Sequence, residues 1–196
     1  SALWGVVIMS VATTFHAIRQ LLQPAKIVAS SGSSLIITES GKQATMRSIQ
    51  LDGVGAHAFF IQHDKCGFPG NASFAPHGSL HRGCDAIGFC EVDGDPFILF
   101  IELKSYEPTL PDVSQQFLAA ECFLRYLSIL LERYCNCDDI LRWPQRYFVF
   151  HNQAATPLSK KAIRPDFDNS QPDRPMFLPV NSGAKAYARQ LLNRPL

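Results

Sequence analysis

Neither acidic nor basic residues dominate this sequence. Its 18 lysines and arginines nearly balance 17 aspartates and glutamates, so the formal net charge is only +1. A chain with this balance has no global electrostatic attraction for nucleic acid, and any electropositive surface must be local. One modest basic region runs from Arg125 to Arg164, and it predicts either a solvated face or a rim that contacts phosphate groups.

The cysteines lack the spacing of a disulfide framework or a zinc site. Cys90 falls within an expected strand and Cys122 within an expected helix, where small buried thiols are common. Cys135 and Cys137 are separated by one residue instead of two, and no second pair with zinc-site spacing accompanies them. We therefore expect reduced thiols and a cytoplasmic protein.

No hydrophobic run in the sequence is long enough to predict a membrane span. The apolar run from Leu3 to Met9 fades by Thr13 and is shorter than the ~20 residues that a span requires. No positively charged residue precedes this run, as a signal peptide would need. The pattern instead predicts an amphipathic or buried helix over Leu3–Leu22, ended by Pro24.

The sequence does contain the pattern of an α/β protein. Its 196 residues, 46% of them hydrophobic, suit one domain over residues 1–196 with a sizeable core. One long helix is expected to begin with Asp112 as its N-cap and to keep apolar residues at helical spacing as far as Tyr134. A last helix is expected over Ala184–Leu192. Strands are expected at Leu35–Thr38, Ala44–Leu51, Ala58–Ile61, Tyr147–Phe150 and Met176–Val180.

The segment from Asp85 to Lys104 is the most informative part of the chain. Two apolar runs flank Asp93-Gly94-Asp95-Pro96, which is a strong turn signal and predicts a hairpin. In an antiparallel hairpin the start of the first strand lies beside the end of the second, so Asp85 and Glu102 are expected to meet. The two-residue period of a strand puts Glu102 and Lys104 on one face. Two carboxylates and an amine are thus expected to converge at one end of the sheet.

These residues resemble the motif of the PD-(D/E)XK, or restriction-endonuclease-like, nuclease superfamily. The matching elements are Asp85, a turn, an apolar strand and Glu102-Leu103-Lys104, with Cys84 in place of the family's proline. The resemblance implies a restriction-endonuclease-like α/β core with a central mixed β-sheet flanked by helices. It also implies a metal-dependent nuclease whose catalytic residues are Asp85, Glu102 and Lys104.

The resemblance further implies how the site would work. Asp85, Glu102 and the main-chain carbonyl of Leu103 would hold Mg²⁺ or Mn²⁺ through oxygen atoms. Lys104 would position or deprotonate the attacking water, or neutralise charge on the phosphate. The alternative interpretation is a surface ion pair at the strand end, worth at most ~1 kcal/mol.

Several other residues are accessory candidates. Gln115 or Gln116 matches a glutamine that some branches of the superfamily place near the metal, although either could equally be a capping or surface amide. The first predicted helix contains no acid to support a second metal. Glu39 or Asp64 could substitute, although Glu39 is more simply a solvated residue in an expected hairpin turn. Candidate nucleic-acid-binding residues are His81, Arg82, Lys160, Lys161 and Arg164.

The sequence thus predicts a nuclease, acting as an endonuclease or an exonuclease, that hydrolyses DNA to 5′-phosphate ends. RNA as the substrate is one alternative, and a catalytically inactive module that binds nucleic acid or protein is another. The expected partner is nucleic acid, DNA ahead of RNA, with no membrane. The domain could act as a homodimer or within a larger assembly, in restriction, defence or repair.

Overall fold

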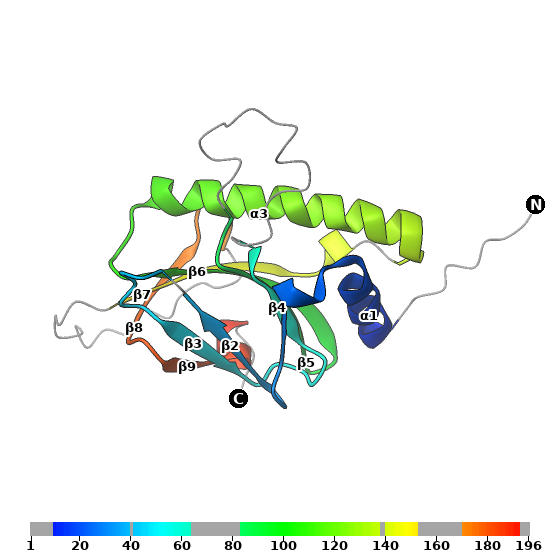
Figure 1. Ribbon diagram of the computed structural model, residues 1–196, viewed down its shortest axis with the longest axis horizontal. Helices are drawn as coiled ribbons and strands as arrows, with labels where there is room; N and C mark the ends of the chain where they lie inside the picture. Colours follow the sequence, from blue (N-terminus) through cyan, green and yellow to red (C-terminus); the bar gives the residue numbers. More distant parts are fainter. Residues whose placement is uncertain (1–9, 40, 64–82, 138–139, 153–169, 193–196) are drawn as a thin grey trace, which may run out of the picture.

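The computed structural model describes residues 10–39, 41–63, 83–137, 140–152 and 170–192. Its centre is a six-stranded mixed sheet below one long helix (Figure 1). In spatial order the strands of this sheet are β1 (Ile27–Ala29), β4 (Phe59–Ile61), β5 (Ala86–Val92), β6 (Asp95–Lys104), β7 (Gln145–Asn152) and β8 (Met176–Val180). Neighbours from β1 to β6 are antiparallel, whereas β6, β7 and β8 are parallel.

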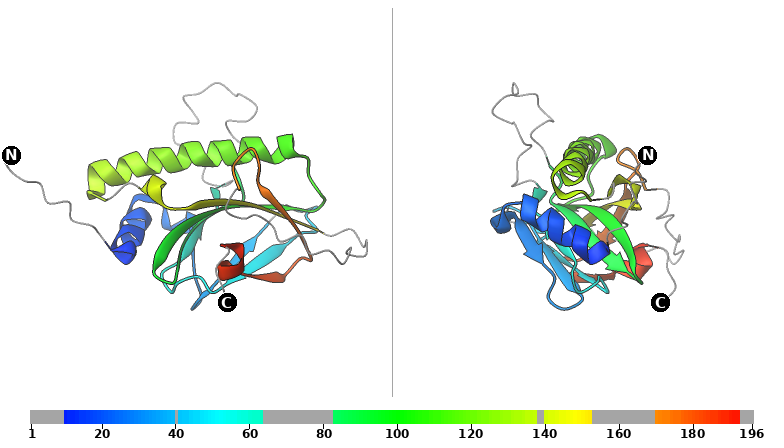
Figure 2. Two further views of the ribbon diagram at one scale, coloured as in Figure 1. Left: turned by 180° about the vertical axis from the view of Figure 1, so that it is seen from behind. Right: turned by 90° about the vertical axis from the view of Figure 1, so that its right-hand side faces the viewer.

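Helices cover one face of this sheet. The helix α3 (Leu110–Leu130), which follows β6 and precedes β7 in the chain, crosses that face. The helix α1 (Val11–Leu21) packs beside it (Figures 1 and 2). The predicted α/β class, with a mixed central sheet flanked by helices, is confirmed. Short turns of helix complete this layer: η1 (Pro24–Lys26), η3 (Leu131–Cys135) and η4 (Ile140–Arg142).

A second sheet covers the other face of the central sheet. It contains β2 (Ser34–Thr38), β3 (Ser48–Asp52) and β9 (Ala184–Tyr187), and it is followed by the single helical turn α4 (Ala188–Leu191). The buried apolar side chains of the described residues form two clusters, one between α3 and the central sheet and one between the two sheets. The central strands are therefore buried on both faces, which explains why the apolar run before Glu102 is continuous.

The predicted hairpin is present with a two-residue turn. Val92 pairs with Asp95, so the turn consists of Asp93 and Gly94, and both have positive φ values, 56° and 87°. Two consecutive left-handed residues match the right-handed twist of the paired strands, which is why Asp-Gly is favoured here. The turn fixes the register of every pair down to Ala86 and Ile101, and so fixes the place of the residues just beyond them.

Three predicted helix boundaries are wrong in the described residues. The first helix begins at Val11, because Ser10 has extended backbone angles and its hydroxyl accepts the Thr13 N–H at 3.2 Å. The N-cap of α3 is Thr109, and Asp112 instead accepts the Thr109 N–H at 3.2 Å from the third helical position. The predicted helix over Ala184–Leu192 begins only at Ala188, because Ala184–Tyr187 forms β9, which pairs in parallel with β3.

Residues 1–9, which contain the whole apolar run from Leu3 to Met9, lie outside the described residues. In the part of the chain that the structure describes, no helix is both long and apolar enough to cross a membrane.

Candidate active site at the end of the central hairpin

The hairpin brings Asp85 and Glu102 together at the end where β5 begins and β6 ends. Continuing the register of Ala86 with Ile101 by one residue places Asp85 opposite Glu102. The main-chain N–H of Asp85 donates to Glu102 Oε2 at 3.1 Å, and Asp85 Oδ2 accepts the N–H of Leu103 at 2.6 Å. The Glu102 carboxylate thus binds the main chain of Asp85, and the Asp85 carboxylate binds the main chain of the residue after Glu102. These two bonds fix both side chains relative to the sheet.

Glu102 and Lys104 lie on the face of β6 that α3 covers. Ile98 and Phe100, which precede them at the two-residue period, belong to the cluster under α3, whereas Leu103 belongs to the cluster between the sheets. The ammonium of Lys104 lies 2.5 Å from Glu102 Oε1. This ion pair is not a surface contact, because the side chain of Glu102 is only 2% exposed and that of Lys104 is 21% exposed.

The helix α3 adds Gln116 to the site. Its side-chain Nε2 donates to Glu102 Oε1 at 2.8 Å and to the carbonyl of Gly83 at 3.2 Å. Its Oε1 atom is buried and has no hydrogen-bond partner among the described residues. An orphaned oxygen beside a buried carboxylate is costly unless a donor or a cation satisfies it. Gln115, one residue earlier, is exposed.

Glu39 reaches the same site from the second sheet. It follows the last residue of β2, is half-buried, and accepts the N–H of Gly41 through Oε1 at 2.5 Å. Its carboxyl group lies close enough to Asp85 to contribute to the raised pKa of Asp85. Glu39 is therefore not simply a solvated turn residue, and it adds a third carboxyl group near the end of the hairpin.

Burial and charge shift the protonation of this group of residues. Burial raises the pKa of Asp85 well above its usual value, and the charge of Glu102 raises it further. Burial likewise raises the pKa of Glu102, against the opposing effects of Lys104 and Gln116. Burial alone would lower the pKa of Lys104, but the charges of Glu102 and Asp85 outweigh it, so its pKa is raised.

The donor atoms of this site fit a hard divalent cation. Two buried carboxylates with raised pKa values, and an amide oxygen without a partner among the described residues, are oxygen atoms of the kind that hard divalent cations prefer. No three histidine, cysteine, aspartate or glutamate side chains form a ready metal cluster within the described ranges. A cation would therefore be held chiefly by Asp85 and Glu102, with main-chain oxygen or water completing its shell.

Other predicted candidates lie elsewhere. Asp64, His81, Arg82, Lys160, Lys161 and Arg164 lie outside the described residues. The sequence interpretation missed His151, which is the register partner of Lys104 on β7 and shares the face of Tyr147 and Val149. Its side chain is 6% exposed. His151 lies opposite Lys104 only because β6 and β7 pair in parallel, and no local sequence pattern predicts that pairing.

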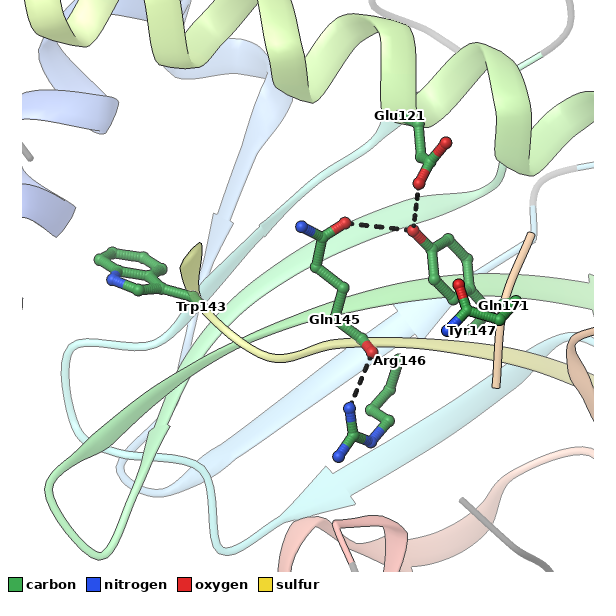
Figure 3. Close-up of a pocket in the computed structure, with 6 residues that line it drawn as sticks. All are labelled: Glu121, Trp143, Gln145, Arg146, Tyr147 and Gln171. Carbon is green, nitrogen blue, oxygen red and sulfur yellow. Dashed lines mark hydrogen bonds between the residues drawn. The ribbon is translucent and has the colours of Figure 1, made fainter. Parts of the chain in front are cut away.

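A separate polar pocket lies on the α3 face near the start of β7, among Glu121, Trp143, Gln145, Arg146, Tyr147 and Gln171 (Figure 3). The Tyr147 hydroxyl donates to Glu121 Oε1 at 2.9 Å and lies 3.1 Å from Gln145 Oε1. Gln145 in turn donates to the carbonyl of Leu141 at 3.2 Å. Because these groups satisfy one another, we interpret them as a structural network that ties α3 to β7.

Comparisons of this chain with protein-family models, with curated proteins and with solved structures find no match. Any functional assignment must therefore rest on the order of the elements and on the geometry of the site.

Proposed function

We propose that this protein is a metal-dependent nuclease of the PD-(D/E)XK superfamily. The observation that carries the proposal is the reciprocal arrangement at the end of the hairpin: Asp85 and Glu102 each bind the backbone beside the other, and Lys104 contacts Glu102 on the same face. The order of elements supports it, because an antiparallel hairpin is followed by a helix and then by a parallel strand. This is the order expected of a restriction-endonuclease-like core.

The proposed chemistry is hydrolysis of a phosphodiester bond of DNA, leaving a 5′-phosphate. A bound Mg²⁺ or Mn²⁺ would supply a Lewis acid for the phosphate and a lowered pKa for bound water. Asp85 and Glu102 would hold that ion, with the carbonyl of Leu103 as a third ligand. Gln116 would orient Glu102, since it donates to one of its oxygens.

Lys104 is better suited to neutralise charge than to accept a proton. Its pKa is raised, because the nearby carboxylates outweigh the effect of burial, so its side chain stays charged at neutral pH. A charged ammonium at the edge of the site stabilises the negative charge that develops on a pentacoordinate phosphate. Of the roles that the sequence pattern left open for Lys104, the charged side chain favours neutralising the phosphate over deprotonating the attacking water.

A digestion series tests the proposal. Purified protein is incubated with circular, linear and single-stranded DNA and with RNA, each in Mg²⁺, Mn²⁺ or EDTA. We expect DNA cleavage that needs the metal and leaves 5′-phosphate ends. Cleavage of RNA alone would reassign the substrate, and no cleavage of any substrate would favour a catalytically inactive binding module.

Gln116→Leu is expected to weaken Mn²⁺ binding and cleavage about 10- to 100-fold, which is typical for the loss of a residue that orients a metal ligand. The substitution removes the amide donor to Glu102 Oε1, so that the carboxylate is held only by the Asp85 N–H and by Lys104. The measurement is the Mn²⁺ concentration that gives half-maximal cleavage. Gln115→Leu is the matched control, because Gln115 is exposed on the same helix turn, and an equal effect in both variants would contradict this role.

A further inference from the structure

The edge of the proposed active site is built by a loop fixed to two strand ends. The loop over residues 41–47 joins β2 to β3, and the N–H of Thr45 donates to Ser105 Oγ at 2.7 Å, directly after β6. Asn152, the last residue of β7, donates through Nδ2 to Thr45 Oγ1 at 2.6 Å. These bonds place the loop beside Lys104, because Ser105 is its chain neighbour.

We call this edge, made of the loop over residues 41–47 together with Ser105 and Tyr106, the rim. It carries positively charged side chains and an exposed aromatic ring. Lys42 and Arg47 are both exposed, and the guanidinium of Arg47 binds the carbonyl oxygens of Gly41 and Lys42, which folds the loop back on itself. Tyr106 follows Ser105 and is 65% exposed. Tyr126, Tyr134 and Tyr187 are exposed as well, so Tyr106 is distinguished by its place directly after the strand that carries Glu102 and Lys104 and not by its exposure.

The carboxylates near this rim are buried. Glu102 is 2% exposed and Asp85 is 9% exposed. The loop and Tyr106 lie near Lys104, so a nucleic acid whose phosphate contacts the Lys104 ammonium would lie close to both. A flexible single strand can bend its backbone toward buried carboxylates, whereas a duplex, with a persistence length of about 150 base pairs, resists such local bending.

We propose that this rim binds single-stranded nucleic acid, with a nucleobase stacked on Tyr106 and the backbone phosphates attracted by Lys42 and Arg47. The combination of an aromatic platform with a cationic groove is the general way in which proteins bind single strands without reading their sequence. The inference rests on the proposed nuclease function and assigns its substrate class: single strands, or the unpaired ends and flaps of duplexes.

The first test asks whether the ring of Tyr106 stacks on a base, and it checks separately that each variant is folded. Tyr106→Ala is expected to weaken binding of a labelled single strand of about 16 nucleotides by 10- to 100-fold, because stacking is worth about 1–3 kcal/mol per base. Tyr106→Phe keeps the ring and should stay within about twofold of wild type. Binding is followed by fluorescence anisotropy in EDTA, and cleavage kinetics in Mn²⁺ should show the loss in KM more than in kcat. Thermal melting checks that each variant is folded.

Tyr134→Ala is the matched aromatic control. Tyr134 is 77% exposed at the far end of α3, in η3, and its loss should leave single-strand binding unchanged. Lys42→Ala should reduce the slope of log affinity against log salt by about 0.7, as expected when one phosphate contact to a single strand is lost. Arg189→Ala is the cation control, because Arg189 pairs with Asp93 at the opposite end of the hairpin.

The outcomes distinguish this inference from the proposed function. Tighter binding and faster cleavage of a single strand than of the matching duplex, both lost in Tyr106→Ala, would support the inference. Equal or better use of the duplex, or an unchanged Tyr106→Ala variant, would overturn it and leave the nuclease proposal standing. Absence of all metal-dependent cleavage would overturn the nuclease proposal, while the anisotropy arm would still decide whether the rim binds single strands.

Discussion

Asp85→Asn is expected to reduce metal-dependent cleavage by at least about 10³-fold, equivalent to ~4 kcal/mol of transition-state stabilisation. The substitution keeps the size of the side chain and an oxygen that can accept the N–H of Leu103, but it removes the charge that a divalent cation needs. Lys104→Ala should have a loss of similar order, because the charge on the phosphate then lacks its ammonium partner. The measurement is the initial rate of cleavage at saturating Mn²⁺.

The control lies in the same hairpin. Asp95→Asn makes the same chemical change at the turn end of β6, where the side chain is exposed, and should leave the rate within about twofold of wild type, as expected of a surface substitution. Circular dichroism and melting curves show whether each variant is folded. A folded Asp85→Asn variant with the wild-type rate would remove Asp85 from the mechanism.

The metal-free site should make the folded protein less stable as pH rises. The pKa of Asp85 is raised by burial and by the charge of Glu102, and the pKa of Glu102 is raised by burial. A group whose pKa is higher in the folded state stabilises the fold fully below its ordinary value, here 3.8 for Asp85, and loses that contribution as pH rises through the folded value. The raised pKa of Lys104 adds nothing to this slope at acid or neutral pH, because its contribution is lost only above 10.5.

We therefore expect Asp85→Asn to melt several degrees above wild type in EDTA, by a margin that grows as pH rises above the ordinary pKa of 3.8, since ~1 kcal/mol shifts the melting temperature of a protein of this size by about 2–4 °C. Mn²⁺ should raise the melting temperature of wild type by more than that of the variant at the same concentration. Burial of His63 lowers its pKa to about 4, which gives a slope of opposite sign between about 4 and 6.5, but this slope is common to both proteins and cancels in the difference. A margin that shrinks as pH rises would contradict the raised pKa values of Asp85 and Glu102 in the folded protein.

The hairpin was predictable because its signals are local. Asp93-Gly94 specifies the turn, the apolar runs specify the strands, and their antiparallel register then places Asp85 opposite Glu102. The choice of Gln116 over Gln115 was not predictable from the capping pattern. It depends on the rotation of α3 over the sheet, and the true N-cap, Thr109, lies three residues before the expected one.

The parts of the site that come from distant segments of the chain could not be predicted from the sequence. Glu39 and the rim loop reach the hairpin only because β2, β3 and β9 form a second sheet against the central one, and the segment over Ala184–Tyr187 has the composition of a helix. His151 reaches Lys104 only through the parallel pairing of β6 with β7. Pairings between segments far apart in the chain leave little trace in local propensity, because tertiary contacts decide them.

The central claim, that Asp85 and Glu102 together hold a divalent cation, is tested most directly by calorimetric titration of the metal-free protein with Mn²⁺. The wild-type protein should bind at least one ion per chain, and Asp85→Asn should bind it at least about tenfold more weakly. Asp95→Asn should match the wild type. No heat of binding in the folded wild-type protein, or equal affinity in wild type and Asp85→Asn, would contradict the account.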